Sequence, residues 1–324
     1  SCNAEGVRRI ALVTDDLNNV SRRDFPALTS FHDREEMDAL QRDLREHAGV
    51  SVLIYSQTCA TEKRRRRKRG KMEDPDRYVI INEEICEGCG DCSAASNCLS
   101  VEPVDTPLGR KRRVNLSSCN KDFTCLDGFC PSFVTVKGPR RAASADVNRL
   151  PGIETALAAL PAPILPKTGT PYNILVTGVG GTGVTTVGAV LSMAAHIDGM
   201  ATTLLNFSGL AQKFGAVMSF VRLADNPAML HQTRIAAASA DALIGCDAVV
   251  SASPAAMKTY RKGTAAILNL AEMTTGEIVR NRDLDLQIDD RLATIAGACG
   301  SDDIEGFDAN AIAETLLGDT VYAN

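Results

Sequence analysis

The stretch CEGCGDCSAASNC, residues 86–98, constrains this 324-residue chain more than any other part of its sequence. It places three cysteines at two-residue intervals and a fourth after a longer gap, and seven of the eleven cysteines lie between Cys86 and Cys130. Disulfides require an oxidising compartment, and the sequence shows no basic head followed by an apolar run that would direct export. We therefore expect these thiols to bind a metal.

The C-x2-C-x2-C spacing of residues 86–92 lets three thiolates converge from one tight loop onto three irons of a [4Fe–4S] cube. Gly88 and Gly90 allow the backbone to wrap closely and to direct N–H groups at the sulfurs. In bacterial ferredoxins a remote cysteine followed by proline supplies a further ligand, and Cys130 fits that description. The predicted ligands of a first cluster are Cys86, Cys89, Cys92 and Cys130.

The remaining cysteines of this segment, Cys98, Cys119 and Cys125, depart from the ferredoxin spacing. Three interpretations stay open for them: a three-iron cluster, a cube with a non-cysteine ligand, or no second cluster. Structural zinc is the alternative for the whole segment, although zinc usually takes its ligands as two C-x2-C pairs. The dispersed cysteines are expected to be small buried hydrophobic side chains; they are Cys2, Cys59, Cys246 and Cys299.

Charge is distributed unevenly along the chain. The formal net charge is −5 and the pI about 5.5, which argues against a general nucleic-acid binder, although eight of the 35 basic residues lie between Lys63 and Lys71. We interpret this run, EKRRRRKRGK, as a docking surface for an acidic electron carrier or as a partner of acidic residues in other domains. No window approaches a membrane span of about 18 apolar residues, so a soluble, cytoplasmic protein is expected.

The first 75 residues predict a small α/β arrangement. Residues 8–14 are predicted to form a buried strand, and a helix follows, capped by Asp33, with Met37, Leu40 and Leu44 on its apolar face. Residues 50–60, VSVLIYSQTCA, predict a second strand. One βαβ unit has too few strands for a stable sheet, so we expect it to be the tail of a larger domain in a longer polypeptide.

The rest of the chain falls into three parts. Residues 82–136 show little helix or strand periodicity and are expected to fold around their metal. A proline-rich linker follows, with one short helix expected over 152–160. From Asn173 onward, alternating elements predict an α/β domain with a mostly parallel sheet, a helix ending near His196 and a terminal helix in DANAIAETLLG. The predicted strands are NILVTG, TTLLNF, VMSFVRLA, ALIGC, AVVSA and TAAILNL, and no internal repeat is visible.

A glycine-rich loop follows the strand NILVTG, and its G-x-G-x-x-G spacing is typical of dinucleotide binding. The expected acidic residue is replaced by Asn206, so classical NAD use is not expected; the loop either packs closely or binds another phosphate-bearing group. Arg222 is a further candidate anion contact. The candidate cofactor-binding or interface residues are Gly178, Gly180, Gly181, Gly183, Gln212 and Lys213. No catalytic acid and base pair stands out among the four histidines, and no thiamine-diphosphate motif is present.

Several segments in this order resemble the long single-chain indolepyruvate ferredoxin oxidoreductases of the 2-oxoacid:ferredoxin oxidoreductase superfamily. They are VSVLIYSQTCATEKRRRRKRGK, INEEICEGCGDCSAASNCLSVEP, GRKRRVNLSSCNKDFTCLDGFCPSFVTV, VTGVGGTGV and GLAQKFGAVMS. The resemblance implies the end of a thiamine-diphosphate-type α/β domain over residues 1–75 and a ferredoxin-like iron–sulfur domain over 76–137. It further implies a linker over 138–171 and a Rossmann-like, gamma-type α/β domain over 172–324. Thr185 and Phe214 depart from the family's glycine loops, where valine and glycine are expected.

The resemblance also implies an activity. It is the oxidative decarboxylation of an aryl pyruvate such as indolepyruvate to an acyl-CoA and CO2, with thiamine diphosphate and Mg in the full-length enzyme and ferredoxin as electron acceptor. Its implied partners are the remaining domains of the polypeptide and further copies of the chain, with no nucleic acid and no membrane. Two alternatives stay open: a noncatalytic ferredoxin-type electron-transfer subunit with a nucleotide-binding domain, and a zinc-stapled nucleic-acid-binding protein.

Overall fold

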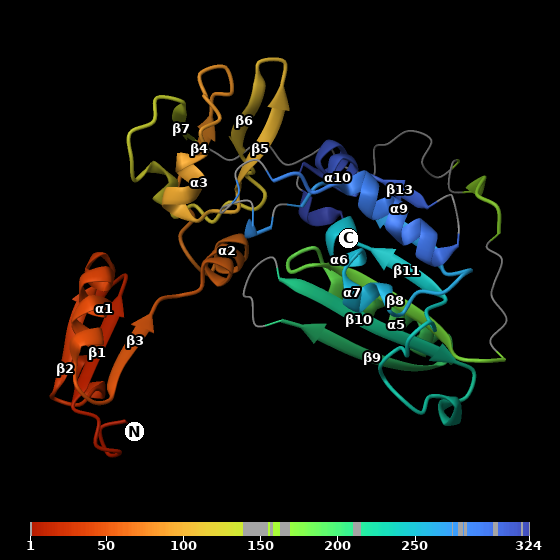
Figure 1. Cartoon of the computed structure of the whole chain (residues 1–324), viewed down its shortest axis with the longest axis horizontal. Helices are drawn as coiled ribbons and strands as arrows, with labels where there is room; N and C mark the ends of the chain where they lie inside the picture. Colours follow the sequence, from red (N-terminus) through yellow and green to blue (C-terminus); the bar gives the residue numbers. More distant parts are fainter. Residues whose placement is uncertain are drawn as a thin grey trace. The chain divides into compact units, whose positions relative to one another are not determined.

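The computed structural model describes residues 2–138, 155, 158–162, 169–209, 215–273, 275–277, 281, 284–300, 304–318 and 320–323. The chain divides into two compact units, Ser1–Asp74 and Pro75–Asn324 (Figure 1). Across the described ranges, no helix is both long and apolar enough to cross a membrane. The expected linker helix over 152–160 lies largely outside the described residues.

The first unit is a three-stranded parallel sheet in the order β2-β1-β3. Its strands are β1 (Arg9–Thr14), β2 (Thr29–Asp33) and β3 (Ser51–Ser56), with α1 (Met37–Glu46), η1 (Leu17–Asn19), η2 (Arg22–Asp24) and η3 (Arg34–Glu36). The predicted cap is confirmed, because Asp33 and Glu36 form a capping box that starts η3, and α1 continues from it. Sequence analysis missed β2, whose residues TSFHD include too few apolar side chains to stand out.

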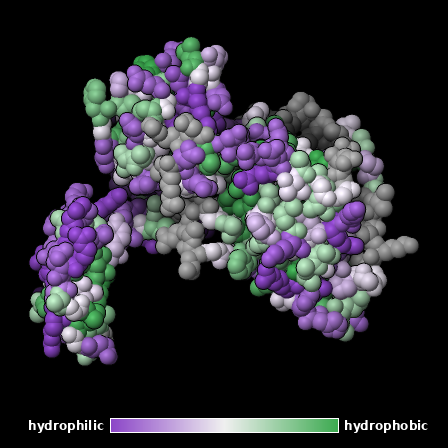
Figure 2. All heavy atoms as spheres, in the orientation of Figure 1, coloured by the Kyte–Doolittle hydropathy of each residue, from purple (hydrophilic) through white to green (hydrophobic). Residues whose placement is uncertain are grey.

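Packing in this unit follows the predicted apolar face of the helix. Leu40 of α1 is buried with Ala11 and Val13 of β1, and Met37 and Leu44 pack against them. The exposed side of the unit near α1 is hydrophilic (Figure 2). The helical stripe and the buried central strand therefore confirm the predicted arrangement, with one strand added.

The basic run forms a helix, α2 (Ala60–Lys68). Within it, Glu62 pairs with Arg65 and Arg66 at 2.9 and 3.1 Å. Lys63 reaches across the unit, and its Nζ donates to Asp15 Oδ2 at 2.5 Å, just beyond the end of β1. The basic run thus pairs with acidic residues of its own unit, whereas the sequence analysis expected partners in other domains.

The cysteine-rich segment has more regular structure than its sequence predicts. Its elements are β4 (Arg77–Ile81), α3 (Asp91–Ser96), β5 (Val101–Thr106), β6 (Gly109–Val114), η4 (Thr124–Leu126) and β7 (Phe133–Lys137). Strand β4 pairs with β7 and β5 pairs with β6, both antiparallel. Ile81, Cys86 and Val101 form its small buried core. The prediction of a segment poor in strands was wrong, because these strands are short and carry many charged residues on their outer sides.

Residues 172–324 contain a six-stranded sheet in the order β13-β12-β11-β8-β10-β9. The strands are β8 (Tyr172–Val179), β9 (Ala201–Ser208), β10 (Ala216–Ala224), β11 (Ala242–Gly245), β12 (Ala265–Asn269) and β13 (Glu305–Phe307). Strand β10 is antiparallel to both of its neighbours, and the other pairs are parallel. The predicted α/β class with a mostly parallel sheet is confirmed.

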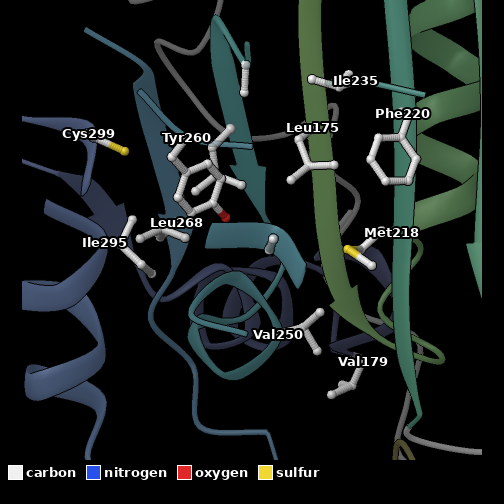
Figure 3. Close-up of a cluster of buried hydrophobic side chains, with 13 residues drawn as sticks. Leu175, Val179, Met218, Phe220, Ile235, Val250, Tyr260, Leu268, Ile295 and Cys299 are labelled. Carbon is white, nitrogen blue, oxygen red and sulfur yellow. The ribbon is translucent and has the colours of Figure 1, made fainter. Parts of the chain in front are cut away.

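Helices cover both faces of this sheet. Ile174 and Val176 of β8 face α5 (Val184–Ile197), whereas Leu175 between them belongs to the core on the other face, as a period of two requires. In Figure 3, Leu175 and Phe220 point from the strands into that second core, which Ile295 reaches from α9 (Ile288–Cys299). The other elements are α6 (Ala248–Ser251), α7 (Pro254–Met257), α10 (Ala309–Leu317), η6 (Pro227–Met229) and η7 (Thr320–Tyr322).

One predicted strand in this part is a helix. AVVSA was expected to be a strand because of its β-branched residues, but it forms α6. The reason is Asp247, a buried N-cap whose carboxylate accepts hydrogen bonds from Val250 N at 2.8 Å and Val179 N at 2.5 Å. The predicted terminal helix is confirmed as α10, capped by Asp308.

Candidate metal centre

The first cysteine loop leaves β4 through Asn82. The carbonyl of Asn82 accepts a hydrogen bond from Cys86 N at 2.9 Å, and Gly88 N donates to Cys86 Sγ at 3.3 Å. Gly88 and Gly90 have φ of 74° and 78°, the left-handed region that favours glycine. Helix α3 begins after Gly90 and carries Cys92. The backbone therefore wraps around the thiols as the sequence predicts.

Gly88 is required for a second reason. A Cβ at this position would overlap the backbone carbonyl oxygen of Arg110 on β6. Backbone atoms cannot swing aside as a flexible side chain can, so any larger residue would have to push the loop away from the strand. The glycine thus fixes how closely the first loop approaches the β5–β6 pair.

The second cysteine loop leaves β6 through Asn115 in the same manner. The Asn115 carbonyl accepts a hydrogen bond from Cys119 N at 3.0 Å, and Lys121 N donates to Cys119 Sγ at 3.4 Å. Lys121 and Phe123 have φ of 52° and 62°, and η4 begins after Phe123. The guanidinium of Arg77 lies over the Phe123 ring at 4.4 Å, which holds this residue in a conformation costly for a non-glycine side chain.

The two loops are an internal repeat, contrary to the sequence analysis. Each starts with an asparagine four residues before its first cysteine and takes positive φ two and four residues after that cysteine. Each loop is followed by a further cysteine just before the next strand. The carbonyl of this cysteine accepts a hydrogen bond from the strand. Val101 N donates to Cys98 at 3.3 Å, and Phe133 N donates to Cys130 at 3.4 Å. Few side chains are shared, so only the asparagine and cysteine positions could have revealed the repeat.

The thiols fall into two groups according to which neighbouring cysteines raise the pKa of each one. Burial raises the pKa of Cys92, and the neighbouring Cys89 and Cys86 raise it further. Burial also raises the pKa of Cys125 to about 12, with additional increases from Cys98 and Cys119. The first group matches three of the predicted ligands, and the second joins the three cysteines that were left over.

Cys119 belongs to the second group by the same criterion, because burial and then the nearby Cys98 raise its pKa. The Sγ of Cys130 contacts Ser132 Oγ at 3.0 Å. Its strand β7 pairs with β4, which leads into the first loop. The strand pairing thus brings the segment that follows Cys130 beside the start of the first loop, and the role of Cys130 as a ligand stays a prediction.

The thiols of the cysteine-rich segment are not gathered around a single ion. Within the described residues no disulfide forms, and no three His, Cys, Asp or Glu side chains are close enough to hold one metal ion. A single zinc requires its sulfurs at about 2.3 Å from one centre, whereas each thiolate of an iron–sulfur cube binds a different iron. The binding of a cluster by these cysteines stays a prediction.

The glycine loop between β8 and α5 is tightly packed. A Cβ at Gly178 would meet the side chains of Thr182 and Val184 and the Cβ of Cys246. Gly180 N donates to the Gly215 carbonyl at 2.7 Å, and Thr182 Oγ1 donates to the Val179 carbonyl at 2.8 Å. These contacts use loop groups internally and favour the packing interpretation. Gly181 and Gly183 take φ of 108° and 81° at the turn itself.

Two polar residues that the sequence analysis considered for ligand binding make hydrogen bonds within the protein. Asn206 lies on β9, which β10 separates from β8, and it accepts a hydrogen bond from Ser219 of β10, so it does not occupy a ribose-binding position. Arg222 is buried, and its guanidinium donates to Asn173 Oδ1 at 2.7 Å and to the Gln232 carbonyl at 2.6 Å. Gln212 and Lys213 lie outside the described residues.

The dispersed cysteines differ from the expectation of burial. Cys299 is buried in the core of the second unit, as predicted. Cys246 is half-buried, and burial, together with Asp247, raises the pKa of its thiol to about 11. Cys2 and Cys59 are exposed, so the prediction was wrong for them. Both lie outside the sheet of the first unit, where no core is available to cover them.

Comparison with known proteins supports the superfamily suggested by the sequence. Residues 173–324 match the family described as pyruvate ferredoxin/flavodoxin oxidoreductase. A 55-residue stretch is 40% identical to indolepyruvate oxidoreductase subunit IorB of Pyrococcus horikoshii, and one of the same length is 38% identical to that of Thermococcus kodakarensis. Each match covers 17% of this chain and 27% of the relative, so the chain spans about a quarter of the length of these curated relatives.

Two solved structures are also similar. The pyruvate oxidoreductase subunit PORC of Thermotoga maritima is 17% identical, with a TM-score of 0.34 over 48% of this chain and 71% of that one. The gamma subunit of a keto/oxoacid ferredoxin oxidoreductase from Geobacter sulfurreducens is 16% identical, with a TM-score of 0.27 over 47% and 70%.

Proposed function

We propose that this chain is part of a 2-oxoacid:ferredoxin oxidoreductase in which residues 76–137 transfer electrons and residues 172–324 form the gamma-type domain. The observation that carries this proposal is the pair of cysteine loops, each with a backbone N–H donated to a cysteine sulfur. The family match over residues 173–324 supplies the second support. A [4Fe–4S] cluster, when bound, carries one electron at a time.

The protein's own groups would hold and tune the first cluster. The proposed ligands are Cys86, Cys89, Cys92 and Cys130. Hydrogen bonds to sulfur favour the thiolate and raise the reduction potential of a cluster, and the Gly88 amide is placed for that role. Cys86 is buried beside Ile81 and Val101, which excludes water from this side of the loop. Cys89 is exposed and gives electrons a path to the surface.

The substrate and acceptor proposed for the complete enzyme are an aryl 2-oxoacid such as indolepyruvate and ferredoxin. The names of the relatives, indolepyruvate oxidoreductase subunits, support this substrate class. Thiamine diphosphate with Mg would supply the decarboxylating chemistry in the complete enzyme, and CoA would accept the acyl group. We propose that other domains or subunits, and further copies of the chain, complete the assembly.

The basic helix α2 is proposed to contribute to docking. Lys63 forms an ion pair with Asp15. Arg65 and Arg66 are exposed, and both pair with a single carboxylate, that of Glu62. An excess of positive charge attracts an acidic partner over a distance of about 10 Å, the Debye length at 0.1 M salt. An acidic ferredoxin or an acidic neighbouring domain fits this surface.

The test is to purify the chain without oxygen and record its iron, acid-labile sulfide, zinc and reduced-state EPR spectrum. Cys89→Ser should lose an iron–sulfur EPR signal, whereas Cys2→Ser, at an exposed cysteine outside the segment, should match the wild type. Stoichiometric zinc with no iron would contradict the proposal and favour the zinc-stapled alternative. Electron transfer from reduced ferredoxin to the chain, without added 2-oxoacid, separates the redox role from catalysis.

A further inference from the structure

The internal repeat places an aspartate where the first loop has a cysteine. Cys89 is the third residue after Cys86, and Asp122 is the third residue after Cys119. The first loop reads C-x2-C-x2-C and the second reads C-x2-D-x2-C. The substitution occurs at the position that supplies the middle ligand of the tripod.

The backbone shows that this alignment is structural. Gly88 and Lys121, two residues after the first cysteine of each loop, have φ of 74° and 52° and donate their amides to that cysteine's sulfur. Cys89 and Asp122 follow directly, and both are exposed. The residue after each, Gly90 or Phe123, has left-handed backbone angles and is the N-cap of the helix that follows. The side chains of Cys89 and Asp122 therefore start from equivalent points.

The pairing of the strands determines which loop each remote cysteine lies beside. Asn115 N donates to the Ser100 carbonyl at 2.7 Å, and Val101 pairs with Val114. These contacts bring the segment after Cys98 beside the start of the second loop. The same relationship holds between Asn82 and the segment after Cys130. Each remote cysteine thus lies with the loop of the other half.

We propose that Asp122 is the fourth ligand of a second iron–sulfur cluster, whose other ligands are Cys98, Cys119 and Cys125. This inference rests on the proposed function, since it requires that the segment binds clusters at all. A carboxylate is harder than a thiolate and holds iron less firmly in a sulfur-rich site. The iron at Asp122 is therefore the one that oxidation removes.

The chemistry of that loss balances with a named oxidant. Ferricyanide takes one electron from [4Fe–4S]2+, one Fe2+ leaves, and [3Fe–4S]+ remains on the three cysteines. Ferricyanide becomes ferrocyanide in the same step. The first cluster, with four cysteine ligands, keeps all of its irons under the same treatment.

Asp122 could also serve only to stabilise the turn before η4, and this role predicts different results from those of an iron ligand. Its Oδ1 accepts hydrogen bonds from Thr124 N at 3.3 Å and Thr124 Oγ1 at 3.1 Å, which stabilise the start of η4. Asparagine preserves an oxygen acceptor for both contacts but is a poor iron ligand. Asp122→Asn therefore separates the ligand role from the turn, and Asp122→Cys restores a cysteine at this corner.

The experiment measures iron content and EPR before and after ferricyanide treatment of the anaerobically purified chain. We expect the wild type to lose one of about eight irons and to develop a three-iron signal. Asp122→Asn should be purified with about seven irons, whereas Asp122→Cys should keep about eight and give no three-iron signal. Asp127→Asn, which removes a charge from an exposed neighbouring position, should match the wild type.

Two outcomes would overturn the inference, and they differ from failure of the proposed function. If Asp122→Asn and Asp122→Cys match the wild type in iron content and oxidised EPR spectrum, Asp122 only caps the turn. If the wild type holds about four irons, the second site is absent while the electron-transfer function stands. A wild type without iron would overturn both proposals.

Discussion

The backbone amide of Asn82 donates to the carbonyl of Ser132 at 2.8 Å, which ties the start of the first cysteine loop to the segment after Cys130. Asn115 makes the matching bond to Ser100 in the other half. The two halves of the segment are therefore interlocked, and each proposed site draws residues from both. This crossing explains why the remote cysteines depart from the spacing of the loops they are proposed to complete.

Replacing the remote cysteines one at a time tests the crossing. Cys130→Ser should abolish the same EPR signal as Cys89→Ser, because both residues are proposed ligands of the first cluster. Cys98→Ser should abolish the other signal. Anaerobic redox titration with EPR detection distinguishes the two clusters. Loss of the second signal in Cys130→Ser would show that the ligands do not cross.

Loss of the first cluster should leave the C-terminal domain intact. The sheet formed by β8 to β13 has its own buried core around Leu175 and Phe220, to which no cysteine of the loops contributes. We expect hydrogen exchange in residues 173–179 of Cys89→Ser to match the wild type. Rapid exchange there would show that cluster binding and the gamma-type domain fold together.

Gly88→Ala should destabilise the first loop more than Gly109→Ala. Both positions have positive φ, 74° and 92°, which costs alanine about 1–2 kcal/mol. At Gly88 the new Cβ also overlaps the Arg110 carbonyl, which adds about 1–3 kcal/mol, whereas nothing lies within 4 Å of a Cβ at Gly109. The urea midpoint for loss of cluster absorbance measures the difference, and equal midpoints would contradict the packing argument.

The Asp15 and Lys63 pair makes the first unit sensitive to acid. Partial burial acts to raise the pKa of Asp15, but the hydrogen bond and charge of Lys63 lower it below the ordinary value of 3.8. Its stabilising contribution is therefore complete above pH 3.8 and is lost as the pH falls through the lowered folded value. The protection of the amides of residues 9–14 against hydrogen exchange, relative to the unfolded chain, should fall over that range in the full chain, and Asp15→Asn should remove this component.

Asp247→Ala should strongly destabilise the C-terminal domain. It leaves the buried amides of Val179 and Val250 without their acceptor, at a cost of about 2–4 kcal/mol. Asp308→Ala removes the exposed cap of α10 and should cost about 1 kcal/mol. Thermal unfolding of both variants tests the ranking, and an equal loss would mean that burial of Asp247 is unimportant.

The sequence predicts the elements that carry periodic apolar residues. The α1 stripe of Met37, Leu40 and Leu44 and the buried strand β8 are of this kind, because local burial decides them. It misses α6, where the single cap Asp247 overrides the β propensity of its valines. It also misses the position of β9, because strand order depends on contacts that no local pattern records.

The candidate site shows the same division. The first tripod is visible in the sequence because three cysteines share one short loop. The proposed role of Asp122 is not visible, since a lone aspartate among surface residues gives no signal until the two loops are compared through their φ angles. The burial of the candidate anion contact Arg222 is not visible either, because its partner Asn173 lies 49 residues away in the sequence.

The most direct measurement is iron and acid-labile sulfide per chain, with zinc determined on the same anaerobically purified sample. The account predicts about eight irons and eight sulfides and no stoichiometric zinc. Zinc in place of iron would contradict the proposed electron-transfer function.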